Sequence, residues 1–120
     1  MARSIVLVGL NHQTAPVEVR EQVAFGNGQL EPALRRLVEL EGVAEAAIVS
    51  TCNRVEVIAC GTHPDVVQAA LPAFLAREHG LPEAVLAGHL YAHAGRDAVR
   101  HLFRVAASLD SMIVGEPQIL

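Results

Sequence analysis

The sequence predicts an α+β domain, a ferredoxin-like split βαβ sandwich of order β-α-β-β-α-β with an additional C-terminal helix. Two observations support this prediction. Apolar runs with the length of strands alternate with segments of helical periodicity along the 120 residues. The second and third runs are separated only by residues 50–54, which fits a tight connection between two strands. The terminal helix is predicted over 97–109, where apolar residues recur with the helical period.

The first third of the chain predicts one strand and two helices. Residues 4–10 are apolar on both faces, as in a buried strand. A helix is expected over 17–25, entered through Thr14 as a cap and an early proline. Residues 29–41 show an apolar period of 3.6 before Gly42, which predicts an amphipathic helix with a glycine stop.

The rest of the chain is assigned by the same reasoning. Strands are predicted over 44–51 and 54–61. A helix from Pro64 to Gly80 should be kinked or split at Pro72, because proline removes a helical hydrogen bond. We then expect a short helix over 81–88, a short strand over 89–93 and the helix over 97–109, whose inward stripe is Val99, Leu102, Phe103, Ala106 and Leu109.

Composition indicates a soluble single domain. Its length allows one core without disulfides, and Cys52 and Cys60 have neither a paired-cysteine nor a zinc-finger spacing. The net charge is −4 and the nine cations, all arginine, form no run, which argues against a surface for general nucleic-acid binding. The apolar stretches are too short to cross a membrane. We therefore expect a cytoplasmic protein, and the apolar ending Ile119-Leu120 suggests a piece of a longer chain.

Cys52 is predicted to lie at the tip of the connection between the second and third strands. A structural cysteine is normally buried, whereas a reactive cysteine is partly exposed beside cations or free backbone N–H groups that favour the thiolate. Arg54 and the amides of the turn supply candidates for both. The sequence thus predicts a thiol that a substrate can reach.

His101 is the candidate partner of this thiol. On a helical wheel it shares one side with Arg104, Ser108 and Ser111, away from the predicted apolar stripe. This pattern fits an ordinary solvated face, and it also fits an imidazole that projects into a cleft opposite the cysteine turn. A cysteine with a distant histidine is compatible with acyl transfer through a thioester, with hydrolysis and with a redox-sensing thiol. Spacing alone leaves these three chemistries open.

Signals for a metal or a nucleotide are weak. His89 and His93 are four residues apart, but the segment is more typical of a strand and no nearby glutamate or cysteine completes a shell, so no metal site is expected. The glycines form neither a dinucleotide-binding nor a Walker pattern after a strand. We therefore expect no nucleotide site within these residues.

Three motifs together give the chain a likeness to a known family. They are residues 9–16 (Gly-Leu-Asn-His-Gln-Thr-Ala-Pro), residues 50–54 (Ser-Thr-Cys-Asn-Arg), and residues 101–120, which include the run Gly-Glu-Pro-Gln. The motifs occur in the family's order and span nearly the whole chain. On this basis the sequence resembles the N-terminal catalytic domain of glutamyl-tRNA reductase, which we expect to occupy residues 1–120.

The resemblance implies an activity. Members of this family use NADPH to reduce the glutamyl ester on tRNA to glutamate-1-semialdehyde, the first step of the five-carbon route to tetrapyrroles. Cys52 matches the family's nucleophile, whose thiolate attacks the ester carbonyl to form a thioester that accepts hydride more readily. His101 matches a histidine that assists by protonating the departing ribose oxygen.

The resemblance also implies substrate contacts and partners. Residues that match the family's substrate-binding motifs are Thr51, Asn53, Arg54, Ser111, Glu116, Pro117 and Gln118. An arginine fork suits the substrate carboxylate, and Glu116 suits its ammonium group. NADPH and the contacts of a homodimer would belong to domains absent from this chain, which should therefore form the thioester without reducing it. Glutamyl-tRNA is the expected partner, with glutamate-1-semialdehyde aminotransferase as a further candidate.

Overall fold

The computed structural model describes residues 2–115, with the backbone alone from residue 109 onward. Every predicted strand is present, and so are the predicted helices, except that the segment 81–88 forms only a single 3₁₀ turn. In chain order the elements are β1 (Ser4–Asn11), α1 (Val17–Val23), α2 (Leu30–Val38), β2 (Glu45–Ser50), β3 (Arg54–Gly61), α3 (Pro64–Glu78), η1 (Glu83–Val85), β4 (Tyr91–Ala94) and α4 (Arg96–Gly115).

The strands form one antiparallel sheet in the order β2-β3-β1-β4. The central pair β1 and β3 is in register along its whole length, from Ser4 opposite Gly61 to Asn11 opposite Arg54. The end of β1 therefore lies beside the start of β3, next to the β2–β3 turn. The structure confirms a mixed domain of helices and an antiparallel sheet.

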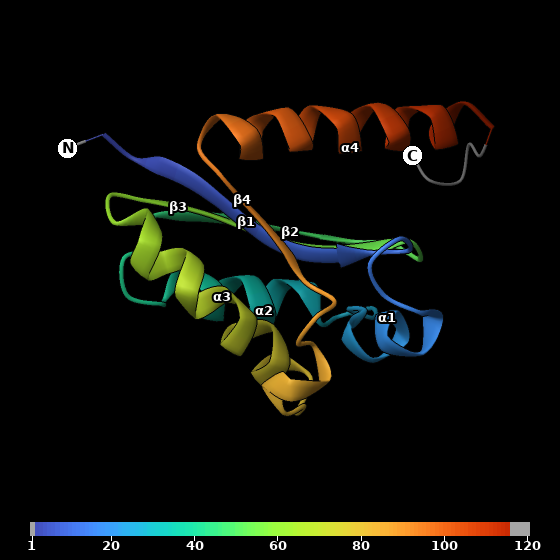
Figure 1. Ribbon diagram of the computed structural model, residues 1–120, viewed down its shortest axis with the longest axis horizontal. Coiled ribbons are helices and arrows are strands. Elements are labelled where there is room, and N and C mark those ends of the chain that lie inside the picture. The colour runs from blue at the N-terminus through green and yellow to red at the C-terminus, as the bar shows by residue number, and fades with distance from the viewer. Residues whose placement is uncertain (1, 116–120) are drawn as a thin grey trace.

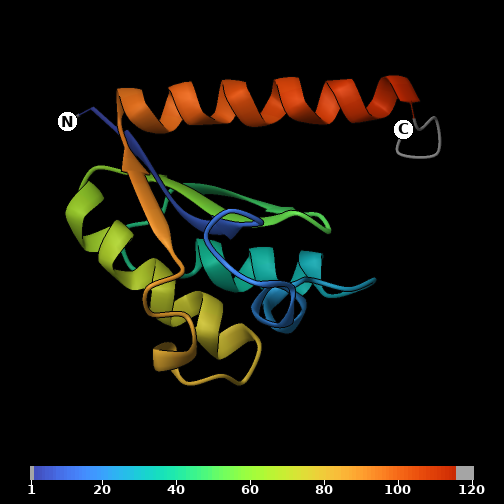
Figure 2. The same cartoon turned by 45° about the vertical axis from the view of Figure 1, so that its right-hand side comes forward.

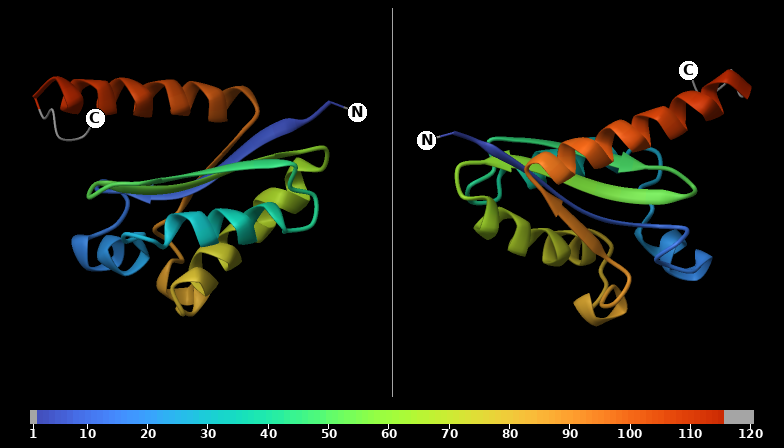
Figure 3. Two further views of the ribbon diagram at one scale, coloured as in Figure 1. Left: turned by 180° about the vertical axis from the view of Figure 1, so that it is seen from behind. Right: turned by 45° about the horizontal axis from the view of Figure 1, so that its top comes forward.

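Helices cover the two faces of the sheet unequally. On one face lie α1, α2 and α3, and on the other lies α4 alone (Figure 1). The view from behind and the tilted view show the same arrangement (Figure 3). The helix α4 begins directly after β4, and its C-terminal part projects past the sheet (Figure 2). The predicted additional helix therefore forms a third layer.

The main core lies between the sheet and helices α1, α2 and α3. Successive side chains of a strand point to opposite faces, so alternate residues of β1 and β3 enter this core. The strand residues buried there are Val6, Val8, Leu10, Val55, Val57 and Ala59. The helices contribute Leu37 from α2 and Leu71, Phe74 and Leu75 from α3. This face has no charged side chain among its buried members.

A smaller apolar cluster lies between α4 and the sheet, formed around buried Leu7, Ile58 and Ala98. The predicted inward stripe of this helix is wrong in part, since Val99 is 42% and Phe103 is 72% exposed, and Ala106 is exposed as well. A carboxyl group on this face of the sheet takes His101 as a hydrogen-bonding partner. We attribute to that hydrogen bond the rotation of α4 that turns part of the apolar stripe toward solvent. Leu109, also assigned to the stripe, lies outside the described side chains.

Two further local predictions are corrected. Of the two alternatives for Pro72, a kink or a split, the split is wrong, since α3 runs unbroken from Pro64 to Glu78. The buried side chains around Pro72 hold the helix despite the one hydrogen bond that proline removes. Thr14 does not cap α1, because its Oγ1 instead accepts the Asn11 N–H at 3.0 Å. The residue before α1 is Pro16, which makes no side-chain cap.

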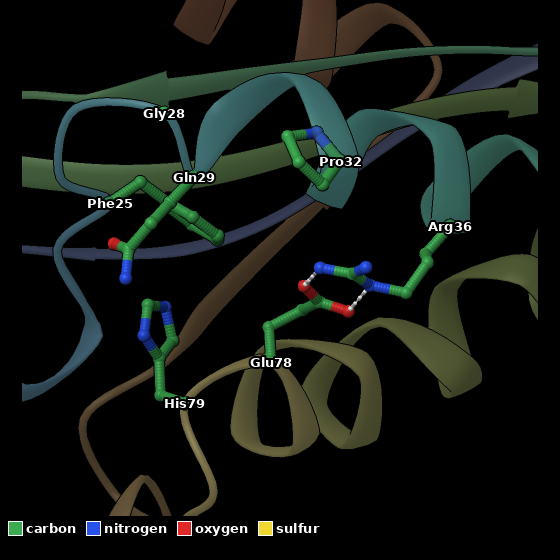
Figure 4. A pocket seen from close by; sticks show the side chains of 7 residues that line it. All are labelled: Phe25, Gly28, Gln29, Pro32, Arg36, Glu78 and His79. Carbon is green, nitrogen blue, oxygen red and sulfur yellow. Dashed lines mark hydrogen bonds and ion pairs between the residues drawn. The ribbon is translucent and has the colours of Figure 1, made fainter.

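A hollow of about 190 Å³ lies between α2, the C-terminal end of α3 and the loop that precedes α2 (Figure 4). Arg36 and Glu78 form a two-pronged ion pair at its edge, with both N···O distances at 2.7 Å. The His79 ring lies 4.6 Å from the Phe25 ring, and burial lowers the pKa of His79 below its usual value. These contacts join α2 to α3, so we assign this hollow a structural role.

Candidate functional site

Cys52 is exposed at the turn between β2 and β3, as predicted. Thr51 shapes this turn, since its Oγ1 accepts the backbone N–H groups of Asn53 and Arg54, each at 3.2 Å. The Thr51 N–H donates to the Arg54 carbonyl at 2.8 Å and closes the hairpin. The N–H groups of the turn therefore donate to the Thr51 side chain and not to the thiol. Cys52 remains at the tip without a hydrogen bond from the described residues.

A small hollow of about 150 Å³ borders the cysteine turn on the side of α1. Besides Thr51 and Cys52 it is lined by Val17, Arg20, Glu21 and Ala24. The Arg20 guanidinium donates to the Ala15 carbonyl at 2.7 Å, which holds this cation at the start of α1. The thiol residue thus faces a space that offers one cation and one carboxylate from the same helix.

Glu56 is the centre of a polar cluster on the opposite face of the sheet, under α4. It is 0% exposed, and its Oε2 accepts hydrogen bonds from the Tyr91 hydroxyl and from Nε2 of His101. Arg54 Nη1 donates to the same oxygen at 3.2 Å. A buried carboxyl group is costly unless it is paired, so these three donors stabilise it. The other oxygen, Oε1, is buried and accepts no bond from the described residues.

Gly9 makes room for this carboxyl group. It lies opposite Glu56 on β3 and opposite Tyr91 on β4. A Cβ atom at Gly9 would lie 2.6 Å from the Val55 carbonyl oxygen and 2.7 Å from Cγ of Glu56. Real Cβ atoms do not approach that closely, so only glycine allows the Glu56 side chain to lie over β1.

The hydrogen bond to Glu56 determines the tautomer of His101. A carboxylate only accepts hydrogen bonds, so Nε2 of His101 carries the hydrogen. Nδ1 is then the nitrogen that can accept a proton, or donate one when the ring is charged. The side chain of His101 is 14% exposed, so the ring is held inside the cluster and not on a solvated face.

Two aromatic groups of β4 complete the cluster. Burial raises the pKa of the Tyr91 hydroxyl well above its usual value of 10, and the hydrogen bond to Glu56 and the charge of Glu56 act in the same direction. Tyr91 therefore remains protonated and donates its hydrogen. The imidazole of His93 stacks on the His101 ring at 4.6 Å between centroids.

The structure places the predicted site residues in two groups. Arg54 and His101 meet at Glu56, whereas Thr51, Cys52 and Asn53 form the turn beyond them. Among the described residues, no hydrogen bond or ring contact joins His101 to Cys52, and the cleft between them stays a prediction. Cys52 precedes Glu56 by four positions along the hairpin, which spans at most about 13 Å of extended chain. The Ser111 side chain lies outside the described side chains, and Glu116, Pro117 and Gln118 lie outside the described residues.

The sequence patterns did not indicate Glu56, Tyr91 or the stacking role of His93. A signal for Glu56 was available, because a carboxylate within the otherwise apolar run of residues 55–60 is unusual in a buried strand. Alternation would have placed Glu56 on the same face of β3 as Arg54. Tyr91 and His93 show the same period of two, but the sequence has no signal that pairs β4 with this site.

The described residues fit neither a metal ion nor a dinucleotide. No three histidine, cysteine or carboxylate side chains among them cluster as a metal shell would require. Dinucleotides bind at the strand ends of parallel sheets behind a glycine-rich turn, whereas this sheet is antiparallel throughout. Residues 2–115 therefore do not fit NADPH. No helix of the described part is both long and apolar enough to span a bilayer.

Together, fold and site define a small α+β domain with an accessible thiol on a hairpin turn, beside a buried arginine, carboxyl and imidazole cluster. A family model described as "Glutamyl-tRNAGlu reductase, N-terminal domain" matches residues 8–120. The chain belongs to this family.

Individual relatives agree with the family model. Glutamyl-tRNA reductase of Syntrophotalea carbinolica is 55% identical over 117 residues, which is 98% of this chain and 26% of the relative. That of Geobacter sulfurreducens is 56% identical over 98% of this chain and 27% of its own length. The solved structure of glutamyl-tRNA reductase from Methanopyrus kandleri matches with a TM-score of 0.63 and 36% identity, over 96% of this chain and 25% of that one. The chain thus spans about a quarter of the length of these relatives.

Proposed function

We propose that this chain carries out the thioester-forming step of glutamyl-tRNA reduction, with Cys52 as the nucleophile. The thiolate sulfur bonds to the carbonyl carbon of the glutamyl ester, and the bond from that carbon to the ribose oxygen breaks. The ribose oxygen takes up one proton, so the products are a glutamyl thioester and free tRNA. The observation that carries the proposal is the exposed Cys52 on a turn that leads directly into the Arg54–Glu56–His101 cluster.

In this proposal His101 supplies the proton to the ribose oxygen. Glu56 holds the Nε2 hydrogen, so the proton leaves from Nδ1. Glu56 thereby acts as the orienting third group that a cysteine and histidine pair often needs. Since His101 and Cys52 do not touch, the ester would lie between them, with its carbonyl at the thiol and its ribose oxygen toward the imidazole.

Arg54 is proposed to bind the side-chain carboxylate of the glutamyl group. A guanidinium has five N–H donors in a planar fork, and Glu56 accepts one of them at 3.2 Å. Thr51 and Asn53 belong to the same turn and would contact the substrate beside it. The remaining predicted contacts, Ser111, Glu116, Pro117 and Gln118, follow along α4 and beyond it, and Glu116 would take the ammonium group.

The family membership extends the proposal to the whole enzyme. NADPH would be the reductant, bound by the part of the longer relatives that this chain does not match. A homodimer contact would belong to that part too, in a cytoplasmic enzyme whose product passes to glutamate-1-semialdehyde aminotransferase. Residues 1–120 would be the N-terminal catalytic domain. We also assign its sheet to the ferredoxin-like class, which the strand order and the antiparallel pairing support.

The test is to incubate the chain with tRNA that carries labelled glutamate and to locate the label on the protein. We expect the label on Cys52, released by hydroxylamine as a thioester would be. Cys52→Ser should carry no hydroxylamine-sensitive label. Cys60→Ser is the matched control, because Cys60 is the other free cysteine and lies inside β3, and it should be labelled normally. Unlabelled protein, or equal labelling of both variants, would contradict the proposal.

A further inference from the structure

A second imidazole supports the candidate catalytic histidine. The ring of His93 stacks on that of His101 with 28° between the planes, and Tyr91 lies within 5.5 Å of both rings. His93 pairs with Leu7 and Tyr91 with Gly9, so both side chains of β4 point to the face of the sheet that α4 covers. The His101 ring is therefore bounded by Glu56, Tyr91 and His93.

We propose that His93 is a positioning residue for His101: while neutral it fixes the plane of the His101 ring, and once protonated it no longer supports the stack. This inference rests on the proposed role of His101 in thioester formation. The backbone of His93 is itself held, since the Gln68 amide on α3 donates to its carbonyl at 3.0 Å. The stack is thus built on a strand that is anchored from the other face of the sheet.

The charges around His93 favour its neutral form. Burial lowers the pKa of His93 below its usual value of 6.5, and the adjacent His101 lowers it further. Arg104 on α4 acts in the same direction, whereas Asp97 on α4 and Glu56 on β3 oppose it. The other ionisable group of β4 at the stack, Tyr91, stays protonated, and β1 presents uncharged Leu7 opposite His93.

A second proton would disturb this arrangement. Glu56 carries one negative charge, which it shares between the Arg54 guanidinium and the Nε2 hydrogen of His101, so it can compensate no second charge in the ring pair. A further charge on His93 would place two cationic rings 4.6 Å apart, and like charges at that distance repel. Thioester formation should therefore decrease as the pH falls and His93 gains its proton, in addition to the protonation that any cysteine and histidine pair undergoes.

The experiment measures the rate of Cys52 acylation by glutamyl-tRNA between about pH 5 and pH 8, the range in which imidazoles titrate. His93→Phe keeps an aromatic ring in the stack but cannot be protonated, so its rate at neutral pH should stay within about twofold. The acid limb of its profile, the fall of the logarithm of the rate at low pH, should have a slope smaller by one, because one proton fewer is taken up. His93→Ala removes the stack and should be roughly ten- to a hundredfold slower at every pH. His63→Phe, at the start of α3 and outside the cluster, is the matched control and should behave as the unaltered chain does.

Two outcomes would overturn the inference. One is an acid limb of His93→Phe as steep as that of the unaltered chain, and the other is a rate for His93→Ala equal to the unaltered rate. In both cases the unaltered chain would still acylate Cys52, so the proposed function would stand. Absence of acylation in the unaltered chain would instead overturn the proposed function. If His93→Ala shows no cooperative unfolding transition and is therefore not folded, the acid limb of His93→Phe is the test of the inference.

Discussion

The two faces of the sheet differ in what they bury. The face toward α1, α2 and α3 buries apolar side chains, with Val6, Val8 and Leu10 of β1 as its centre. The face toward α4 buries a carboxyl group with its three donors beside a small apolar cluster. The same two central strands supply both faces, because their residues alternate. One layer of backbone therefore separates a core that stabilises the domain from a cluster that is suited to chemistry.

This difference shows how the register of the sheet carries the function. A slip of one residue would move every side chain of β3 to the other face. Glu56 would then enter the apolar core, and Val55 and Val57 would face α4. The all-apolar core therefore fixes the register, and the register places the polar cluster.

The largest effect is expected from Phe74→Ala in α3. Phe74 is 0% exposed in the main core, and truncation of a buried phenylalanine leaves a cavity. We expect a loss of about 3–5 kcal/mol in the free energy of unfolding, measured by urea denaturation. Acylation of Cys52 should stay close to the unaltered rate under conditions where the variant is folded. A loss below about 1 kcal/mol would contradict the assignment of the main core.

Gly9→Ala should affect both faces at once. The new Cβ would overlap with the Val55 carbonyl and with Cγ of Glu56, and relief of such overlap costs about 1–3 kcal/mol. Acylation should slow as well, because the displaced Glu56 no longer orients His101. Gly26→Ala is the control, since its Cβ would meet only the end of the Gln29 side chain at 3.3 Å. Equal stability of the two variants would show that the close approach at Gly9 is absent.

The third variant, Tyr91→Phe, tests the polar face through the dependence of stability on pH. The raised pKa of Tyr91 means that the folded chain binds the hydroxyl proton more tightly than the unfolded chain. The resulting stability is fully present below pH 10 and is lost as the pH rises through the folded-state pKa. Tyr91 is the single tyrosine and the chain has no tryptophan, so tyrosinate absorbance reports this group alone.

We expect no tyrosinate signal near pH 10 while the chain remains folded. At neutral pH, Tyr91→Phe should cost about 1.5 kcal/mol, the lower end for a hydrogen bond to a charged group, because Glu56 keeps two donors; its stability should fall less above pH 10. An absorbance midpoint at pH 10 in the folded chain would contradict a protonated, buried donor.

The sequence predicted the apolar face well and the polar face poorly. Periodicity located the strands and helices because burial of apolar side chains repeats with the geometry of each element. It also found Cys52, since a turn between two strands is a local feature. The partners of Glu56 come from β3, β4 and α4, and nothing local in the sequence brings these segments together. His101 was found on the wheel, but its neighbours were not.

The error on α4 has the same origin. The wheel of residues 97–109 has its apolar centre near Val99, so apolarity alone turns Val99 and Phe103 inward. In the structure, α4 instead buries Ala98 and Val105 and turns His101 toward a buried carboxyl group. This hydrogen bond offsets part of the lost burial of Val99 and Phe103. A hydrogen bond to a charged group contributes a net of about 1.5–3 kcal/mol to the free energy of unfolding, which is comparable to the burial of one large apolar side chain.

The smallest effect is expected from Phe103→Ser, which tests this orientation of α4 directly. Phe103 lines an open apolar hollow of about 320 Å³ with Val99, Leu102 and Ala106, and its ring is mostly exposed. The free energy of unfolding should change by less than about 0.5 kcal/mol, and self-association at high concentration should decrease. Leu102→Ala, one position earlier and partly buried against Leu7 and Ile58, should cost more. If Phe103→Ser were the more damaging of the two, the helix would present its apolar stripe to the sheet, and His101 could not then reach Glu56.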